Sequence, residues 1–209
     1  MSSQLSLKGS TRTVTEFFEY SINSILYQRA VYPSEDFVAV RKYDLNLLKT
    51  HDDELKTYIR QILQQVHRWL LGGKCNKLVL CIVDKPSCEI VERWEFDVEH
   101  TAQGTEEGAN GDQAQLNSNQ DETQKQIRAL MRQITASVTF LPELDDGEDN
   151  YTFNVLAYTD ANAKVPLEWA DSSPAEIADS EKVQFRSFST NDHQVRTQVC
   201  YRVQPSSKS

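Results

Sequence analysis

The chain has four cysteines and four histidines, the side chains that most often bind zinc or act in covalent chemistry. The cysteines are Cys75, Cys81, Cys88 and Cys200; their spacing fits no zinc-binding pattern, and no histidine lies at ligand spacing from them. Cys81 and Cys200 fall within strand-like runs, where a reduced thiol packs as a small apolar side chain. The sequence therefore predicts free cysteines and no metal site.

The histidines and acidic residues also lack the spacing of a catalytic site. We expect surface or packing roles for the four histidines, which lie at a helix start, within a helix, at a strand end and in a turn: His51, His67, His100 and His193. There is no glycine-rich phosphate loop, no G-x-S-x-G elbow and no H-E-x-x-H sequence. Acidic clusters such as Glu106-Glu107 fall in turns, where solvated charge is the ordinary interpretation. The sequence indicates binding rather than an enzyme, with no cofactor.

Composition narrows the classes of partner. The formal net charge is −9 and the isoelectric point is near 5.0, which argues against nucleic acid because phosphate binding needs clustered cations. No run of eighteen apolar residues could cross a membrane, and the N-terminus has no apolar signal core. We therefore expect a protein that stays inside the cell without membrane attachment.

A basic stripe stands out on this acidic chain. Lys125, Arg128 and Arg132 follow one another at i, i+3 and i+7 beside the apolar face of an expected helix. One interpretation is a solvated helix face. The other is a protein-docking surface, since the flat guanidinium of arginine makes both ion pairs and apolar contacts.

A long polar connection, about residues 160–181, follows a strand-like run at 151–159. Compact domains seldom contain so long a connection unless it is disordered or functional. This one contains apolar residues that a solvated linker would not need: Val165, Pro166, Leu167, Trp169 and Ile177. It is either a loop pinned to the surface or a mobile strap that packs in more than one way.

The C-terminal region predicts a β-hairpin. Residues 195–203 alternate apolar and polar side chains, and Val183 and Phe185 alternate in the preceding strand, so a turn is expected at Thr190-Asn191-Asp192. A hairpin tethered by a long strap can leave one sheet edge and pair at another. The vacated edge then offers unpaired backbone groups to a partner strand.

The elements that position these features form an α+β fold with three helices packed on a mainly antiparallel sheet. We expect a flexible N-terminus over 1–10, a single domain over 11–203 and a flexible tail over 204–209. The helices are predicted from Thr11 or Thr13 to about 29, from about 52 to Gly72-Gly73, and from about 121 to 138. Strands are expected at 37–40, 43–48, 77–84, 89–99 and 151–159, and residues 100–120 are predicted to be a disordered loop.

Four separated blocks identify a family. EFFEYSINSILYQRAVYP (16–33), VERWEFD (91–97), RQITASVTFLP (132–142) and the ending SFST..H.V...V.Y.V (187–203) closely resemble the mitotic-arrest-deficient spindle-checkpoint proteins, and the second of that set in particular. Those proteins are HORMA-domain adaptors. The resemblance covers nearly the whole chain, except the low-complexity loop, an acidic turn at 145–149 and the two tails.

The resemblance implies a domain with open and closed topologies. In the closed form, the C-terminal segment (about 160–203) crosses the sheet like a seat belt and traps an extended peptide. The peptide comes from the activator of the anaphase-promoting complex or from the checkpoint scaffold partner, the first mitotic-arrest-deficient protein. The residues implied in peptide binding are Phe153, Val155, Tyr158, Trp94, Val165, Pro166 and Trp169.

The resemblance also implies a conformational homodimer through the third helix. Arg132 and Gln133 match its central residues and Phe140 matches a nearby apolar contact, which favours an interface role for Arg128 and Lys125 as well. His193 and Thr197 match a switch region, although Thr197 replaces the serine of the family. Further implied partners are a BubR-type component and an AAA-type remodelling ATPase, and the implied locations are nucleus, kinetochore or spindle, and cytoplasm.

Two hypotheses follow from the resemblance. The first is a checkpoint adaptor that delays anaphase by capturing the activator. The second is another HORMA adaptor, such as a translesion-polymerase subunit, which shares the sequence L-Y-x-R-x-x-Y-P found at 26–33. The blocks at 91–97 and 132–142 favour the first. An enzyme of unknown type would need a constellation of residues that this sequence does not contain.

Overall fold

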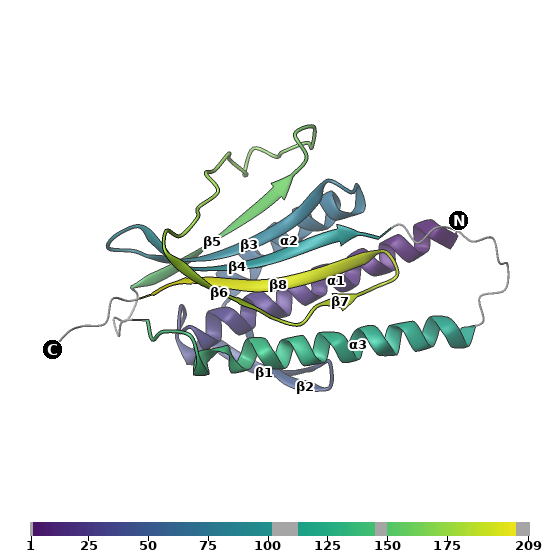
Figure 1. The fold of residues 1–209 in the computed structure, drawn as a ribbon, viewed down its shortest axis with the longest axis horizontal. Coiled ribbons are helices and arrows are strands. Elements are labelled where there is room, and N and C mark those ends of the chain that lie inside the picture. Colours follow the sequence, from purple (N-terminus) through teal and green to yellow (C-terminus); the bar gives the residue numbers. More distant parts are fainter. Residues whose placement is uncertain (1, 102–112, 145–149, 204–209) are drawn as a thin grey trace.

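The structure is a computed structural model that describes residues 2–101, 113–144 and 150–203. A sheet in the order β5-β3-β4-β8-β6 is covered on one face by helices α1 and α2, and α3 runs beside α1 (Figure 1). Neighbouring strands of this sheet are all antiparallel. The predicted α+β class, with three helices on a mainly antiparallel sheet, is confirmed.

Helix α1 (Ser2–Gln28) is the centre of the molecule. Its apolar side chains Phe17, Phe18 and Ile22 are at most 1% exposed, and the Phe17 ring meets Phe96 of the sheet edge-on at 5.8 Å. A helix that is apolar around most of its circumference must be surrounded by other elements. The elements packed around α1 bury these side chains.

The start of α1 differs from the prediction of a flexible N-terminus and a cap at Thr11 or Thr13. The helix begins at Ser2, and the Thr13 hydroxyl donates to the Gly9 carbonyl one turn earlier instead of capping an end. The early turns are held by tertiary contacts, because the Ser6 hydroxyl donates to the Asp192 carboxylate at 2.7 Å. The helix propensity of residues 2–10 does not reveal this contact with Asp192.

Helix α2 (Asp53–Leu71) begins and ends as predicted. The Asp52 carboxylate accepts from the Leu55 N–H at 2.7 Å and caps the first turn. Gly72 ends the helix, and Gly73 takes a left-handed conformation (φ +62°) that glycine adopts without strain. The two strands expected next are present as β3 (Cys75–Asp84) and β4 (Glu89–His100), and they pair as an antiparallel hairpin.

The C-terminal strands lie at the edge of the sheet away from β5. Strand β5 (Tyr151–Thr159) pairs with β3 and matches its predicted range, whereas β8 (His193–Arg202) pairs with β4. The strand expected before β8 is broken in two: β6 (Ser180–Gln184) pairs with one half of β8, and β7 (Phe188–Ser189) pairs with the other. We call β6, β7 and β8 together the C-terminal ribbon.

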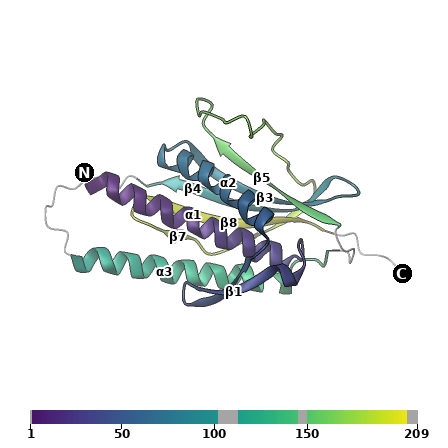
Figure 2. The ribbon, with the colours of Figure 1, turned by 180° about the vertical axis from the view of Figure 1, so that it is seen from behind.

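Helix α3 (Gln113–Ala136) starts earlier than the predicted position near 121, so part of the predicted disordered loop is helical. The rest of that loop, the acidic turn at 145–149 and the C-terminal tail lie outside the described residues. A small hairpin, β1 (Phe37–Lys42) with β2 (Leu45–Thr50), packs beside α1, and Tyr43 lies in its turn rather than in a strand. Figure 2 shows this hairpin on the far side of α1 from α2.

The described residues contain neither a membrane-spanning helix nor a cluster of metal ligands. None of the described helices is both long and apolar enough to cross a membrane. Within the described ranges, no three histidine, cysteine, aspartate or glutamate side chains gather as a metal ion would require.

Candidate functional site

The outer edge of β5 is unpaired in the described part of the chain. Strand β5 is the last strand of the sheet, and the Val155 N–H donates to the Asn154 side-chain oxygen at 2.9 Å rather than to β3. Because backbone groups alternate in direction along a strand, Phe153, Val155 and Ala157 present their N–H and C=O groups outward. Such an edge can accept one more strand through main-chain hydrogen bonds.

The connection between β5 and β6, residues 160–179, crosses back over this edge, and we call it the strap (Figure 1). Its first part is anchored on α2. The Trp69 indole N–H donates to the Lys164 carbonyl at 3.0 Å, and the Trp69 and Trp169 rings meet edge-on with centroids 4.9 Å apart. Two aromatic side chains in this geometry add to the stability that their burial gives.

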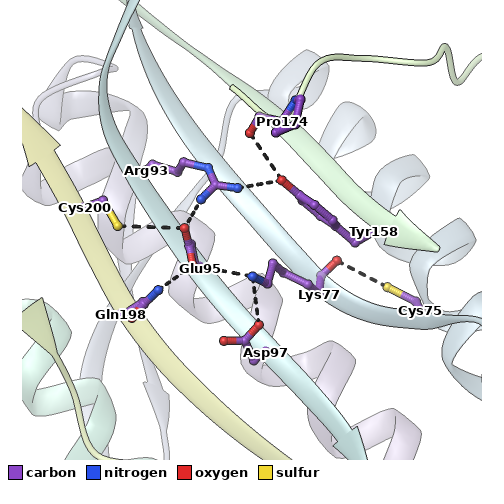
Figure 3. A network of polar contacts seen from close by, with 9 residues as sticks. All are labelled: Cys75, Lys77, Arg93, Glu95, Asp97, Tyr158, Pro174, Gln198 and Cys200. Carbon is purple, nitrogen blue, oxygen red and sulfur yellow. Dashed lines mark hydrogen bonds and ion pairs between the residues drawn. The ribbon is translucent and has the colours of Figure 1, made fainter. Parts of the chain in front are cut away.

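The second anchor is on the face of the sheet opposite the helices (Figure 3). The Tyr158 hydroxyl accepts from the Arg93 guanidinium at 2.7 Å and donates to the Pro174 carbonyl of the strap at 3.3 Å. Lys77 also lies over the Tyr158 ring, with its ammonium 5.4 Å from the centroid. Tyr158 therefore ties β5, β4 and the strap together.

Arg93 is held in place by a polar network on β4. Glu95, which is 4% exposed, forms an ion pair with Arg93 and accepts a hydrogen bond from Gln198 of β8. Lys77 approaches the same carboxylate at 3.7 Å. A buried carboxylate is stable only when its charge and lone pairs are satisfied, and this one is satisfied by groups from three strands. The network links the strap anchor to the C-terminal ribbon.

Two cavities lie between the strap, β5 and α2. One of about 580 Å³ is lined by Tyr58 and Ile62 of α2, Val155 of β5, and Pro166 and Trp169 of the strap. A second of about 250 Å³ lies directly between residues 155–159 and residues 169–174. The Tyr58 side chain is 45% exposed and meets the Phe153 ring edge-on at 5.6 Å. An extended segment entering here would contact apolar side chains on one side and the free strand edge on the other.

The structure brings together six of the seven residues implied in peptide binding. Phe153 and Val155 face the helices, Tyr158 faces the opposite side, and the strap contributes Val165, Pro166 and Trp169. Trp94 does not join them. It lies on β4, two strands from the free edge, and its ring stacks on Phe185 of the ribbon at 5.6 Å.

The apolar residues of the strap do not all pack against the rest of the chain. Leu167 is fully exposed and Val165 is 51% exposed, whereas Trp169 packs against the core. Val165 and Leu167 lie between the two strap residues that contact Trp69, and their own side chains point away from the core. Of the two exposed side chains, Val165 lines the smaller cavity beside β5.

The five residues of the expected dimer surface divide into two groups. Arg132 and Lys125 of α3 are exposed, and Phe140 is 44% exposed. Arg128 is engaged within the chain, because its guanidinium donates to the Tyr43 carbonyl at 2.9 Å. Gln133 accepts from the Arg186 N–H, between β6 and β7, at 2.7 Å, so its hydrogen bonding depends on the position of the ribbon.

Sequence reasoning missed the residues that fix the ribbon to α3. Gln126 accepts from the Ser189 N–H at 2.9 Å, and the Thr123 hydroxyl donates to the Ser189 carbonyl at 2.6 Å. Phe185 joins the buried Trp94 to the exposed Phe140, whose ring centroid lies 6.2 Å away. Gln126 and Gln133 are seven residues apart and so lie on one face of the helix. This spacing is the sequence feature that could have indicated a polar contact surface on α3.

The expected switch residues lie inside the molecule. His193 is 2% exposed at the start of β8; its Nδ1 is hydrogen-bonded to the Ser10 hydroxyl, and its ring meets His100 edge-on at 5.4 Å. Burial, with a smaller contribution from His100, lowers the pKa of His193 to about 4. Thr197 is 3% exposed on the helix-facing side of β8, so in this arrangement its hydroxyl is inaccessible to a modifying enzyme.

A buried ion pair joins α1 to the sheet and was not predicted. The Arg29 Nε donates to the Glu92 carboxylate at 2.7 Å, the Trp94 indole donates to the other oxygen at 3.2 Å, and Arg29 also donates to the Pro142 carbonyl. Burial raises the pKa of Glu92, while the Arg29 charge opposes that rise. This pair connects α1, β4 and the segment that leads from α3 into β5.

Comparisons with known proteins agree with this architecture. The sequence profile of the HORMA domain matches residues 10–193. The chain is 71% identical over 202 residues to the mitotic spindle checkpoint component MAD2 of Saccharomyces cerevisiae, a match that covers 97% of this chain and 100% of that protein. This chain belongs to the MAD2 family of HORMA-domain proteins.

Other MAD2 matches support the same assignment. The human mitotic spindle assembly checkpoint protein MAD2A is 44% identical over 199 residues, covering 95% of this chain and 93% of that protein. A chain in the crystal structure of the mitotic checkpoint complex superposes with a TM-score of 0.83 at 49% identity, over 93% of this chain and 99% of that chain. The MAD2 matches indicate a spindle-checkpoint function and do not favour the alternative of another HORMA adaptor.

Proposed function

We propose that this chain is a checkpoint adaptor that captures an extended segment of a partner as an added strand on β5, beneath the strap. The observation that carries the proposal is the free outer edge of β5 under a crossing segment anchored at Trp69 and Tyr158. Main-chain hydrogen bonds to the outward groups of β5 supply affinity, and the cavities beside α2 and the strap supply sequence preference. The chain acts by binding and not by catalysis.

The captured segment comes from the activator of the anaphase-promoting complex or from the checkpoint scaffold protein, the first mitotic-arrest-deficient protein. Capture of the activator delays anaphase until kinetochores are attached. Likeness to a chain of the mitotic checkpoint complex supports assembly with checkpoint partners. We infer that the chain works in the nucleus and cytoplasm and at the kinetochore, and that a BubR-type component and an AAA-type remodelling ATPase also bind it.

Capture and release require a second packing of the ribbon. Here β8 pairs with β4, which leaves β5 free; a ribbon paired on β5 would occupy the same edge that the partner needs. A ligand shifts the populations of the two packings only as far as it binds one more tightly than the other. A near-complete switch needs a difference of about 5 kcal/mol between the two binding free energies. The domain over 11–203, with a seat belt over 160–203, is the unit that we propose to switch.

Chromatographic separation of the two packings tests this function. The protein is incubated with a synthetic peptide from the activator, or with the same residues in scrambled order, and its conformers are separated by ion exchange. We expect the activator peptide alone to collect the protein in one conformer that retains the peptide. Retention of both peptides to the same extent would contradict specific capture.

A further inference from the structure

A groove on the helical layer, distinct from the strap cavities, lies between α1, α2 and the end of β2. Its volume is about 620 Å³. Ile59 and Leu63 of α2 form an apolar floor and are 3% and 6% exposed. The walls are mostly charged, with α1 on one side and α2 on the other.

The charge of the groove opposes that of the molecule. Its lining holds three arginines and two lysines against two glutamates, on a chain whose net charge is −9: Arg12, Lys49, Lys56, Arg60, Arg68, Glu16 and Glu19. Within the chain, both glutamates are already paired with lysines: Lys49 reaches Glu19 at 2.6 Å, and Lys42 reaches Glu16. Local carboxylates therefore leave the arginines unneutralised.

The arginines have few partners of their own. In the ranges that the structure describes, neither Arg12 nor Arg60 forms an ion pair, and both are exposed. Among the described residues, the Arg68 guanidinium has one hydrogen-bond partner, the Gln65 side-chain oxygen at 3.5 Å. A guanidinium offers a planar set of donors that matches a carboxylate in two parallel hydrogen bonds. Three such groups around an apolar floor fit a segment rich in aspartate and glutamate with an apolar side chain among them.

The groove is continuous with the capture site. Gln64 and Arg68 of α2 line both the groove and the larger cavity beside β5. Figure 2 shows α2 lying between α1 and β5, so the two sites are separated by a single helix. A helix is about 10 Å across, and an extended chain advances about 3.3 Å per residue, so three or four residues span it.

We propose that the groove between α1 and α2 binds an acidic segment that flanks the captured strand in the same partner. The inference rests on the proposed function, because the captured strand brings the flank close to α2. The flank crosses α2 at Gln64 and Arg68 and places its carboxylates against Arg12 and Arg60. The binding site of the chain is then longer than the strap and β5 alone.

Synthetic peptides of matched length test the inference. The probe is the strand-forming segment of the activator, labelled with fluorescein. It is used alone or with an acidic extension, Glu-Glu-Leu-Glu-Glu, joined through a Gly-Ser-Gly linker to its N-terminus or to its C-terminus. The matched control peptide carries Gln-Gln-Leu-Gln-Gln instead. Dissociation constants are measured by fluorescence anisotropy at low and high salt, because exposed charge pairs weaken as salt rises.

Three proteins are compared: wild type, Arg60→Glu in the groove, and Arg41→Glu. Arg41 is exposed on β1 and lines neither the groove nor the ribbon, so its change alters net charge equally without touching either. Arg60→Gln serves as a milder second variant. Arg68 is left unchanged because it also lines the capture cavity.

At low salt, we expect wild type and Arg41→Glu to bind the peptide with the acidic extension at one end about fivefold more tightly than the peptide with the glutamine extension. Arg60→Glu should lose this advantage while binding the unextended peptide as wild type does. Equal affinities for the acidic and glutamine extensions, or equal losses in both charge variants, would overturn the inference. Failure of wild type to bind the unextended peptide would instead contradict the proposed function, and this inference with it.

Discussion

At the scale of single residues, the strap depends on side chains that join three elements at once. Tyr158 contacts Arg93 of β4 and Pro174 of the strap, and Arg93 is in turn paired with Glu95. Burial of Glu95 makes a missing partner costly, since a buried charge without its counterion is strongly unfavourable. The sequence identified Tyr158 as a candidate but could not show that its hydroxyl faces the strap rather than the helices.

Removal of that hydroxyl is expected to loosen the strap. Tyr158→Phe loses the bond to the Pro174 carbonyl and leaves the Arg93 guanidinium short of an acceptor, at a cost of about 1–3 kcal/mol. A captured peptide should dissociate about tenfold faster, which corresponds to about 1.4 kcal/mol. The matched control is Tyr201→Phe, which removes a bond to Glu181 in the ribbon. Equal dissociation rates in the two variants would rule out a special role for Tyr158.

His193 makes the stability of this packing depend on pH. Its pKa of about 4 lies below the value near 6.5 of an exposed histidine, so unfolding or exposure of His193 takes up a proton. Stability is full above pH ~6.5 and falls as pH drops toward 4, by up to about 3 kcal/mol. The groups that face His193 are His100, which opposes its protonation, Asp192, which favours it, and the hydroxyl of Ser10.

Urea unfolding between neutral pH and pH ~5 measures this dependence. The wild-type protein should lose about 2 kcal/mol more than His193→Gln, which cannot titrate at this position. His67, whose pKa is also lowered by burial, contributes a loss of the same sign to both proteins and cancels in the difference. Parallel stability curves for the two proteins would be incompatible with a buried neutral His193.

At the scale of elements, α3 holds the ribbon through its polar face. Gln126 and Gln133 accept from the N–H groups of Ser189 and Arg186, in the segment where β6 gives way to β7. The same helix carries the exposed Arg132 on the surface expected to dimerise. A shift of the ribbon must therefore change the hydrogen bonding of α3, and this links the packing state to that surface.

Truncation of Gln126 is expected to free the backbone of β7. Gln126→Ala removes the acceptor for the Ser189 N–H, at a cost of about 1 kcal/mol, and the Ser189 amide should exchange with solvent about fivefold faster. Gln124→Ala on the same helix is the control, because Gln124 has no hydrogen-bond partner in the described part of the chain. An unchanged rate at Ser189 in Gln126→Ala would show that α3 does not hold the ribbon.

Elements whose bounds depend on a local sequence pattern were predicted well. Features that depend on contacts between residues far apart in the sequence were not. Strand β5 and the hairpin of β3 and β4 follow from alternation and a turn, and the ends of α2 follow from its cap and glycines. The early start of α1 depends on Ser6 meeting Asp192, which no local pattern reveals. Trp94 lies two strands from β5 because of the order of strands in the sheet. The alternation of apolar and polar residues within one strand does not predict that order.

At the scale of the whole molecule, two surfaces are expected to act separately. Arg132→Ala should weaken self-association because it removes an exposed guanidinium from α3, while peptide capture at β5 should remain as in wild type. Sedimentation and peptide binding, measured on the same samples, give the two readouts. Lys8→Ala, which removes an exposed cation near the start of α1, is the control. Parallel loss of both properties in Arg132→Ala would contradict this division.

The central claim is that a partner joins the outer edge of β5 as a strand, and amide hydrogen exchange resolved by residue tests it most directly. In the free protein, the outward N–H groups of Phe153 and Ala157 should exchange quickly, while those of Asn154 and Leu156, which face β3, stay protected. With the activator peptide bound, the outward amides should become protected in the same alternating pattern. Tight peptide binding that leaves these outward amides exchanging as fast as before would contradict the account.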